Sequence, residues 1–373
     1  MGEVFWCSSC LSMSTRRRIT FNKLGQCNAC QWKIKKENLN WGKRYQELND
    51  LLDRHRSTKG RFDCIVPVSG GKDGSYVAHN LKNKFGMNPL CVTVTPPLQL
   101  DLGKKNLEFF INSGFSVIEI NINPETMLFF NRKGFKEIGF PYYGWLTAIQ
   151  TIPPSIASKF GINLIFYGED GEVEYGGSTE TEKNPIYDFE YMKEIYLENQ
   201  SYNSFQAMLD DGKARGLKDL DFFEFPPNQS HQKLEITHWS YFENWDPYRN
   251  YLVAKEFCGL EENKSVNNGT FTNFAQNDQA LYSLHTYLMF LKYGFGRANQ
   301  DACIEIRRGA ISREQAINLV KLYDGQFPDQ FLDLYLDYYK MNKVEFLDIL
   351  DSWANKDILE KVNDKWQLKF KIC

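Results

Sequence analysis

The 373-residue chain lacks several features that would place it in a class at once. No apolar run approaches the ~18 residues of a membrane-spanning helix, and the first residues do not have the pattern of a signal peptide. Internal repeats and low-complexity tracts are also missing. With 42% hydrophobic residues and a net charge of −3, the chain is predicted to be a cytoplasmic globular protein of one large or two medium domains.

A glycine-rich run follows an apolar segment, Phe62 to Val68, that is predicted to be a buried strand. This run has neither the spacing of a Walker A loop nor the Gly-x-Gly-x-x-Gly of dinucleotide-binding folds. A helical repeat begins directly after it, at Tyr76. The residues of this glycine-rich loop are Val66, Pro67, Val68, Ser69, Gly70, Gly71, Lys72, Asp73, Gly74 and Ser75.

The residue types in the loop favour phosphate binding. Its glycines permit backbone angles that let several N–H groups point at one anion, and the following helix adds its positive N-terminal end. Ser69 and Ser75 can donate hydroxyl hydrogen bonds, and Lys72 supplies a cation. The alternative is a plain glycine turn between a strand and a helix, which would not need this set of side chains.

Strand-like and helical segments alternate from the loop to about residue 167, which predicts a doubly wound parallel α/β sheet. Ligands bind such sheets at the carboxyl ends of the strands, so Thr93, Gly168 and Glu169 are candidate site residues. Glu169 and Asp73 are candidate Mg²⁺ ligands beside a bound nucleotide. The alternative for the cluster around Glu169 is a solvated acidic loop.

The N-terminal segment holds two Cys-x-x-Cys pairs, the pattern of a structural zinc site with four thiolates. Disulfides are not expected in a reducing compartment. The first 60 residues carry twelve Lys and Arg against five Asp and Glu. For this basic excess we favour a docking face or simple solvation over RNA binding. The expected zinc ligands are Cys7, Cys10, Cys27 and Cys30.

The remainder of the chain carries weaker signals. Residues 171–188 are predicted to be a mobile flap over the site. The aromatic cluster that includes Trp245 fits a core better than a sugar-stacking platform, although both remain open. The tail is predicted to be helical, and Arg297 in it either binds a carboxylate or phosphate or lies on the solvated surface. We expect three regions: a zinc module (1–40), a nucleotide-binding core (41–190) and a mostly helical substrate or partner region (191–373).

Ser-Gly-Gly-Lys-Asp-Gly-Ser after a strand resembles the PP-loop of the ATP pyrophosphatases, except that Gly74 separates Asp73 from Ser75. The whole chain is similar to the WbpG-like N-acetyl sugar amidotransferases of surface-polysaccharide synthesis. The matching signs run from the four cysteines through the loop and Tyr167-Gly168-Glu169 to Gly294-Phe295-Gly296-Arg297. The resemblance implies an adenine nucleotide alpha hydrolase-like fold and the use of ATP, Mg²⁺ and Zn²⁺. It also implies conversion of an N-acetyl group, on a free or nucleotide-linked sugar, to an acetamidino group.

The source of ammonia is expected to lie outside the chain. No cysteine sits in a Gly-x-Cys-x-Gly elbow, so a separate glutaminase is predicted, delivering ammonia directly or through a cyclase-like adaptor as such families imply. Two alternatives stay open. One is a tRNA thiolation enzyme, for which the cysteines outside the N-terminal segment are isolated in sequence and the acidic charge is unfavourable. The other is a non-catalytic nucleotide-binding adaptor.

Overall fold

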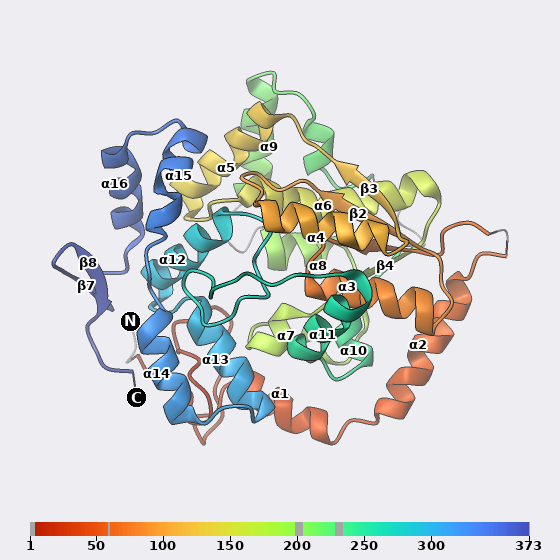
Figure 1. The fold of residues 1–373 in the computed structure, drawn as a ribbon, viewed down its shortest axis with the longest axis horizontal. Coiled ribbons are helices and arrows are strands. Elements are labelled where there is room, and N and C mark those ends of the chain that lie inside the picture. Colours follow the sequence, from red (N-terminus) through yellow and green to blue (C-terminus); the bar gives the residue numbers. More distant parts are fainter. Residues whose placement is uncertain (1–3, 59, 198–203, 228–233, 373) are drawn as a thin grey trace.

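The computed structural model describes residues 4–58, 60–197, 204–227 and 234–372. A six-stranded sheet forms its centre, in the order β3-β2-β1-β4-β6-β5 (Figure 1). All neighbouring strands run parallel except the short β5, which is antiparallel to β6. The strands are β1 (Cys64–Pro67), β2 (Pro89–Val94), β3 (Ser116–Ile120), β4 (Leu164–Tyr167), β5 (Ile186–Tyr187) and β6 (Glu235–His238).

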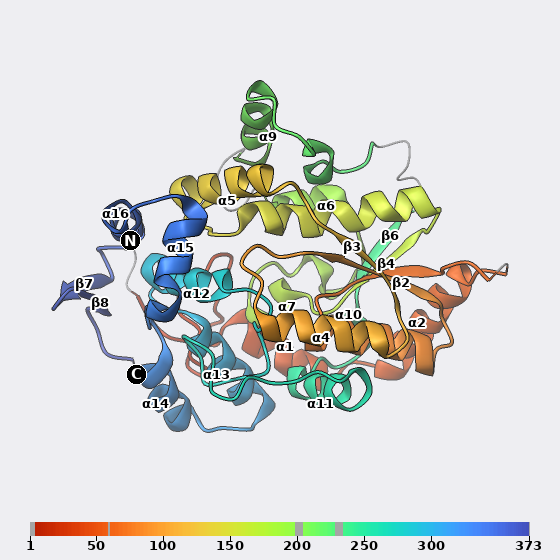
Figure 2. The same ribbon diagram turned by 45° about the horizontal axis from the view of Figure 1, so that its top comes forward.

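Both faces of the sheet are covered, which explains why its strands are continuous apolar runs. Ile65 of β1 packs into one hydrophobic cluster, whereas Cys64 and Val66 on either side of it pack into another. Figure 2 shows α5 (Pro124–Ile138) and α6 (Tyr143–Phe160) on one face of the sheet, with α4 (Asp101–Asn112) on the other. The predicted doubly wound α/β fold is therefore confirmed.

Helix α5 shows how the local sequence fixes an element. Its first-turn N–H groups at Glu125 and Thr126 donate to the side chain of Asn123, and Pro124 occupies the first helical position. The helix ends at Gly139, which has a φ of 65° that most residues avoid. These signals all stand in the local sequence, which therefore fixes both ends of the helix.

The region after residue 190 is not entirely separate from the sheet. β6 comes from it and lies beside β4, and the segment 171–188 ends in β5 at the sheet edge. The core sheet thus extends past the expected boundary at 190, and the three-region division itself stays a prediction. Residues 171–188, for which the sequence predicts a mobile flap, begin with a short helix, α7 (Gly171–Tyr175), and end in a strand.

Most of the remaining chain is helical. Figure 1 shows the C-terminal helices, in blue, gathered beside the sheet together with a two-stranded hairpin. In the described residues, no helix is both long and apolar enough to cross a membrane. The elements are α1 (Asn28–Glu37), α2 (Trp41–His55), α3 (Lys72–His79), α8 (Phe189–Met192), α9 (Ser204–Ala214), α10 (Trp239–Phe242), α11 (Pro247–Cys258), α12 (Leu281–Tyr293), α13 (Arg297–Arg308), α14 (Arg313–Tyr323), α15 (Leu332–Tyr339), α16 (Lys343–Trp353), β7 (Leu359–Val362) and β8 (Lys365–Leu368).

Candidate functional site

The candidate site lies where the strand order of the sheet reverses. β1 has β2 on one side and β4 on the other, so the segments that follow β1 and β4 meet at one edge. A Cβ atom added to Gly168 would lie 3.2 Å from the Cβ of Asp73. The fold therefore brings the glycine-rich loop and the segment after β4 together, as the sequence predicted.

The loop has the shape of an anion cradle. Gly70 has a φ of +77°, and an added Cβ would lie 2.4 Å from the backbone N of Leu107 in α4. Gly71 precedes the first residue of α3 and leaves the start of that helix without a side-chain cap. The first N–H groups of a helix lack intrahelical partners, so those of α3 are available to a phosphate.

Lys72 and Asp73 form an ion pair at the start of α3. Only 9% of Lys72 is exposed, so its ammonium group is held at the loop rather than in bulk water. The second carboxylate oxygen of Asp73 accepts a hydrogen bond from Nδ2 of Asn250 at 3.2 Å. Asn250 belongs to α11 and is fully buried. Sequence reasoning missed it, because a lone asparagine in a helix carries no signal by itself.

Glu169 follows β4 and is held by two neutral donors. The hydroxyl of Tyr175 donates to its carboxylate, and Nε1 of Trp245 donates at 3.1 Å. Loss of hydration, with a further contribution from the Asp73 carboxylate, raises the pKa of Glu169 above its ordinary value. A divalent cation between these two acids would remove that repulsion, so the pair has suitable chemistry for Mg²⁺. Its role as a ligand pair stays a prediction.

The acidic residues that follow Glu169 serve other purposes. Asp170 caps α7 by accepting from the backbone N–H groups of Glu172 and Val173. Glu172 forms a two-bond ion pair with Arg18, and Glu174 accepts from Nε1 of Trp32. Both Glu172 and Glu174 are therefore engaged by the N-terminal segment.

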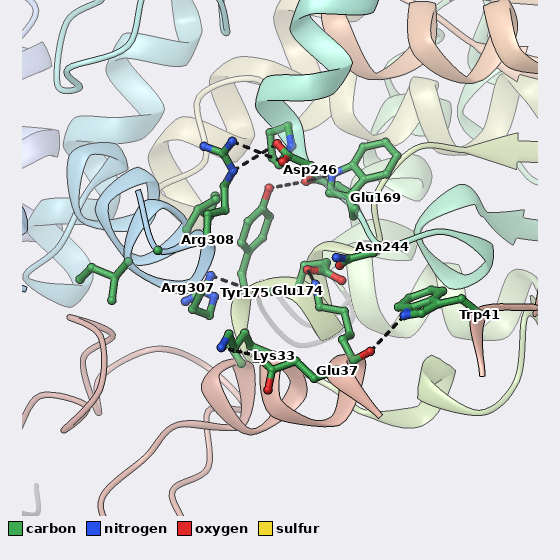
Figure 3. Close-up of a pocket in the computed structure, with 17 residues that line it drawn as sticks. Lys33, Glu37, Trp41, Glu169, Glu174, Tyr175, Asn244, Asp246, Arg307 and Arg308 are labelled. Carbon is green, nitrogen blue, oxygen red and sulfur yellow. Dashed lines mark hydrogen bonds and ion pairs between the residues drawn. The ribbon is translucent and has the colours of Figure 1, made fainter. Parts of the chain in front are cut away.

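Two cavities adjoin this site. A cleft of about 280 Å³ is lined by the loop and, from distant segments, by Gly103, Asn106, Glu169, Asp278 and Arg297. A larger cavity of about 540 Å³ lies between the N-terminal segment, α7 and α13, with Trp41, Tyr175 and Trp245 in its wall. Figure 3 shows Tyr175 in this cavity with its hydroxyl directed at Glu169. Glu169 lines both cavities.

Of four other predicted site residues, two line a cavity and two do not. Arg297 lies in the cleft wall, where its Nε contacts Oδ1 of Asp301 at 2.8 Å, and Trp245 lines the larger cavity although only 5% of it is exposed. Thr93 is buried in β2, and Ser75 has a buried hydroxyl with no hydrogen-bond partner among the described residues. Neither Thr93 nor Ser75 lines the two cavities, so their nucleotide contacts stay predictions.

The four N-terminal cysteines form one buried cluster. Their sulfur atoms all lie within 4.8 Å of one another, with Cys7 and Cys30 at 3.8 Å and Cys10 and Cys27 at 3.7 Å. A tetrahedral site with Zn–S bonds of about 2.3 Å requires sulfur separations of about 3.8 Å. Backbone N–H groups also point at the sulfurs, as from Cys27 to Cys7 Sγ at 3.2 Å. The residues therefore fit a structural zinc ion.

The basic excess of the N-terminal segment is used within the chain. Arg18 pairs with Glu172, Lys36 with Glu174 and Lys35 with Glu182. Arg44, buried at the start of α2, donates to the backbone carbonyls of Glu182 and Tyr241. These basic side chains therefore hold the N-terminal module against the rest of the same chain. They form a docking face whose acidic partner is part of this protein.

Helices α13 and α14 also contact the zinc module. Arg307 of α13 donates to Cys10 Sγ at 3.8 Å and to the carbonyl of Glu174 at 3.2 Å, and it also lines the larger cavity. Cys303, isolated in sequence, is buried next to the cluster, where it accepts from the Ser12 hydroxyl at 3.6 Å. Residues 303 and 307 are four apart and therefore lie on one face of the helix. That spacing could be interpreted only after the position of the cysteine cluster was known.

Comparison with known protein families finds a match at the C-terminal end of the chain. Residues 268–372 match the family model described as "LPS biosynthesis protein WbpG-like, C-terminal domain". These residues form a WbpG-like C-terminal domain. They include Asp278 and Arg297, which line the cleft beside the glycine-rich loop. The WbpG-like domain thus contributes to the candidate site and not only to the periphery.

Two further similarities are more limited. An uncharacterized protein of Methanocaldococcus jannaschii, MJ1599, is 35% identical over 89 residues, or 24% of this chain, and the chain spans about a third (32%) of that relative's length. The structure of NMN synthetase from Francisella tularensis is 11% identical and aligns over 61% of this chain and 89% of that one, with a TM-score of 0.28. A TM-score this low supports no argument about activity.

Proposed function

We propose that this protein is an ATP-using enzyme that adenylates the N-acetyl group of a surface-polysaccharide sugar and replaces its oxygen with ammonia. The observation that carries the proposal is that Glu169 lines two cavities, one lined by a glycine-rich loop and one lined by aromatic rings. An enzyme of this kind must hold a triphosphate and a sugar so that the acetamide oxygen reaches the α-phosphorus. The WbpG-like domain supports the same reading.

In the proposed mechanism, the loop amides and Lys72 hold the β- and γ-phosphates and stabilise charge on the departing pyrophosphate. Asp73 and Glu169 would hold Mg²⁺, which neutralises phosphate charge when bound. Arg297, which lies in the cleft wall, adds a second positive charge from a segment far from the loop in sequence. These groups position the reactants and supply electrostatic stabilisation.

The larger cavity is the proposed sugar site. It is lined by four basic residues (Lys33, Lys36, Arg307 and Arg308) and four acidic ones (Glu37, Glu169, Glu174 and Asp246), which offers many hydrogen-bond partners without a strong net field. Tyr175 and Trp245 line this cavity and donate hydrogen bonds to Glu169, which also lines the cleft. Sugars combine hydroxyl groups with apolar faces, and such a lining suits both.

The tRNA thiolation alternative has less support. Cys64, Cys91 and Cys258 are buried in the hydrophobic cluster on one face of the sheet, and burial raises the pKa of each thiol. None of the three lines the described cleft or the larger cavity. Sulfur transfer needs an accessible thiolate near the reacting atom, and these cysteines do not provide one.

The test is a pyrophosphate-release assay on the purified chain with ATP and Mg²⁺. We expect release with an N-acetyl sugar or its nucleotide-linked form, and an acetamidino product when ammonium is added but not when glutamine is added. The partner that supplies ammonia is proposed to be a separate glutaminase. Release with tRNA alone would favour the thiolation enzyme, and no release with any acceptor would favour the adaptor.

A further inference from the structure

Asp278 is a buried acid in the cleft that the mechanism above does not use. It lies in the wall with only 9% of its surface exposed. Its place is fixed by the backbone: the N–H of Leu100 donates to the Asp278 carbonyl at 2.9 Å, and the N–H of Ala280 donates to the Leu98 carbonyl at 3.0 Å. The WbpG-like domain is thereby tied to the segment that follows β2.

Helix α4 sets the distance between Asp278 and the loop. A Cβ added to Gly103 would lie 2.3 Å from the Cα of Asp278, and one added to Gly70 would lie 2.4 Å from the N of Leu107. Gly103 and Leu107 are four residues apart on one helix face, a spacing of about 6 Å along the axis. Asp278 therefore stands about one helical turn away from the phosphate-binding loop.

The three carboxylates that line the cleft differ in their partners. Asp73 is paired with Lys72, and Glu169 accepts from both Tyr175 and Trp245. The side chain of Asp278 has one side-chain donor among the described residues, the hydroxyl of Tyr282 at a long 3.5 Å. Of the three, Asp278 is the acid with neither a paired cation nor two side-chain donors to hold it ionised.

We propose that Asp278 is the general base of the amidation step, which rests on the function proposed above. The nitrogen lone pair of ammonia forms the new C–N bond to the adenylated carbon, and the C=N π electrons of the imidate move onto the imidate nitrogen. One N–H proton passes to a carboxylate oxygen of Asp278. The electron pair on the former imidate nitrogen then re-forms the C=N bond as the C–O bond to AMP breaks, and AMP leaves with the electron pair of that C–O bond. The carboxyl group afterwards returns the proton to solvent through the cleft.

The surroundings of Asp278 suit this role. Burial raises its pKa to about 7, against a partial lowering by its own backbone N–H and by Tyr282. The other titratable groups that face it are the phenols of Tyr282 on α12 and Tyr142 before α6, both with raised pKa values, and Arg297 lines the same cleft from α13. A base with a pKa near the working pH is the most effective proton acceptor.

The pH dependence follows from the sign of this shift. The base acts in its ionised form, so the amidation rate per free ammonia should rise as the pH increases through about 7 and level off above it. The Tyr282 hydroxyl lowers the pKa of Asp278. In the Tyr282→Phe variant, the rising limb of the pH–rate profile should therefore lie at a higher pH. A residue that only supports the fold would not move that limb.

The decisive experiment measures amidine formed and pyrophosphate released in the same reaction. In Asp278→Asn we expect the ratio of amidine to pyrophosphate to fall at least about tenfold, because the adenylate still forms but is captured poorly by ammonia. An unchanged ratio, together with an unchanged limb in Tyr282→Phe, would overturn the assignment while leaving the proposed function intact. Wild-type protein that releases no pyrophosphate with any N-acetyl sugar would overturn both.

Zinc content and thermal melting show whether Asp278→Asn is folded. If it is not, the pH profiles of the wild type and of Tyr282→Phe decide the matter. A wild-type amidation rate that, per free ammonia, does not change between pH 6 and about 8 contradicts the role of Asp278.

Discussion

At the residue scale, Lys72 is the side chain on which the proposed nucleotide chemistry depends most directly. It is nearly buried at the start of α3 and paired with Asp73, so its charge is presented to the cleft at little entropic cost. We expect Lys72→Ala to lower pyrophosphate release about a hundredfold, with zinc content unchanged, because transition-state charge on the phosphates loses its nearest cation. Steady-state assays with zinc analysis check this.

Lys105→Ala is the matched control for this substitution. Lys105 lies on α4, is about half exposed and pairs with Glu261, and it does not line the described cleft. Its removal should leave pyrophosphate release near the wild-type rate. Equal losses in the two variants would show that the charge of Lys72 acts only through the overall field of the protein.

At the element scale, the close approach of the loop to α4 decides the shape of the cradle. Gly70→Ala would place a Cβ against backbone atoms of Asn106 and Leu107, in addition to the strain of a positive φ. We expect a loss of unfolding free energy of about 2–3 kcal/mol from the clash, plus about 1 kcal/mol from the φ angle, and weaker ATP binding. Denaturant unfolding and calorimetric titration with ATP measure both effects.

Gly161→Ala isolates the backbone strain. Gly161 ends α6 with a φ of +66°, and nothing lies within 4 Å of its added Cβ. This variant should lose only about 1 kcal/mol and bind ATP as the wild type does. The prediction for Gly70 is wrong if the two glycine variants unfold at the same denaturant concentration.

At the scale of the whole molecule, the zinc module acts as a wall of the larger cavity. Its ion pairs with α7 and its contacts with α13 hold Glu174 and Arg307 in place. We expect Cys7→Ser to release zinc, lower the melting temperature and raise the KM for the sugar, because four-thiolate modules depend on metal for their folding. Zinc analysis, thermal melting and kinetics test this expectation.

Cys303→Ser serves as the comparison for the cysteine cluster. Cys303 is buried beside Cys10 but is not one of the four sulfurs that surround the centre of the site. The variant should retain stoichiometric zinc and a near-normal KM. Loss of zinc from it would mean that the ligand set differs from the four predicted cysteines.

The sequence alone determined the parts that local chemistry specifies. The glycine-rich loop after β1, the position of Glu169 after β4 and the four cysteines were all placed correctly, because turn residues, strand periodicity and metal-ligand spacing are encoded within short segments. The start of α5 at Pro124 was predictable for the same reason, since its cap precedes it directly.

Only the tertiary structure decided which distant residues join this site. Asn250, Asp278 and Arg297 reach the loop from segments about 180 to 230 residues away, and the insertion of β6 beside β4 carries no local pattern that marks it. The ion-pair partners of the N-terminal basic residues are likewise acidic residues far along the chain. These placements depend on burying apolar faces against one another, and the free energy of that packing belongs to the assembled fold rather than to any one segment.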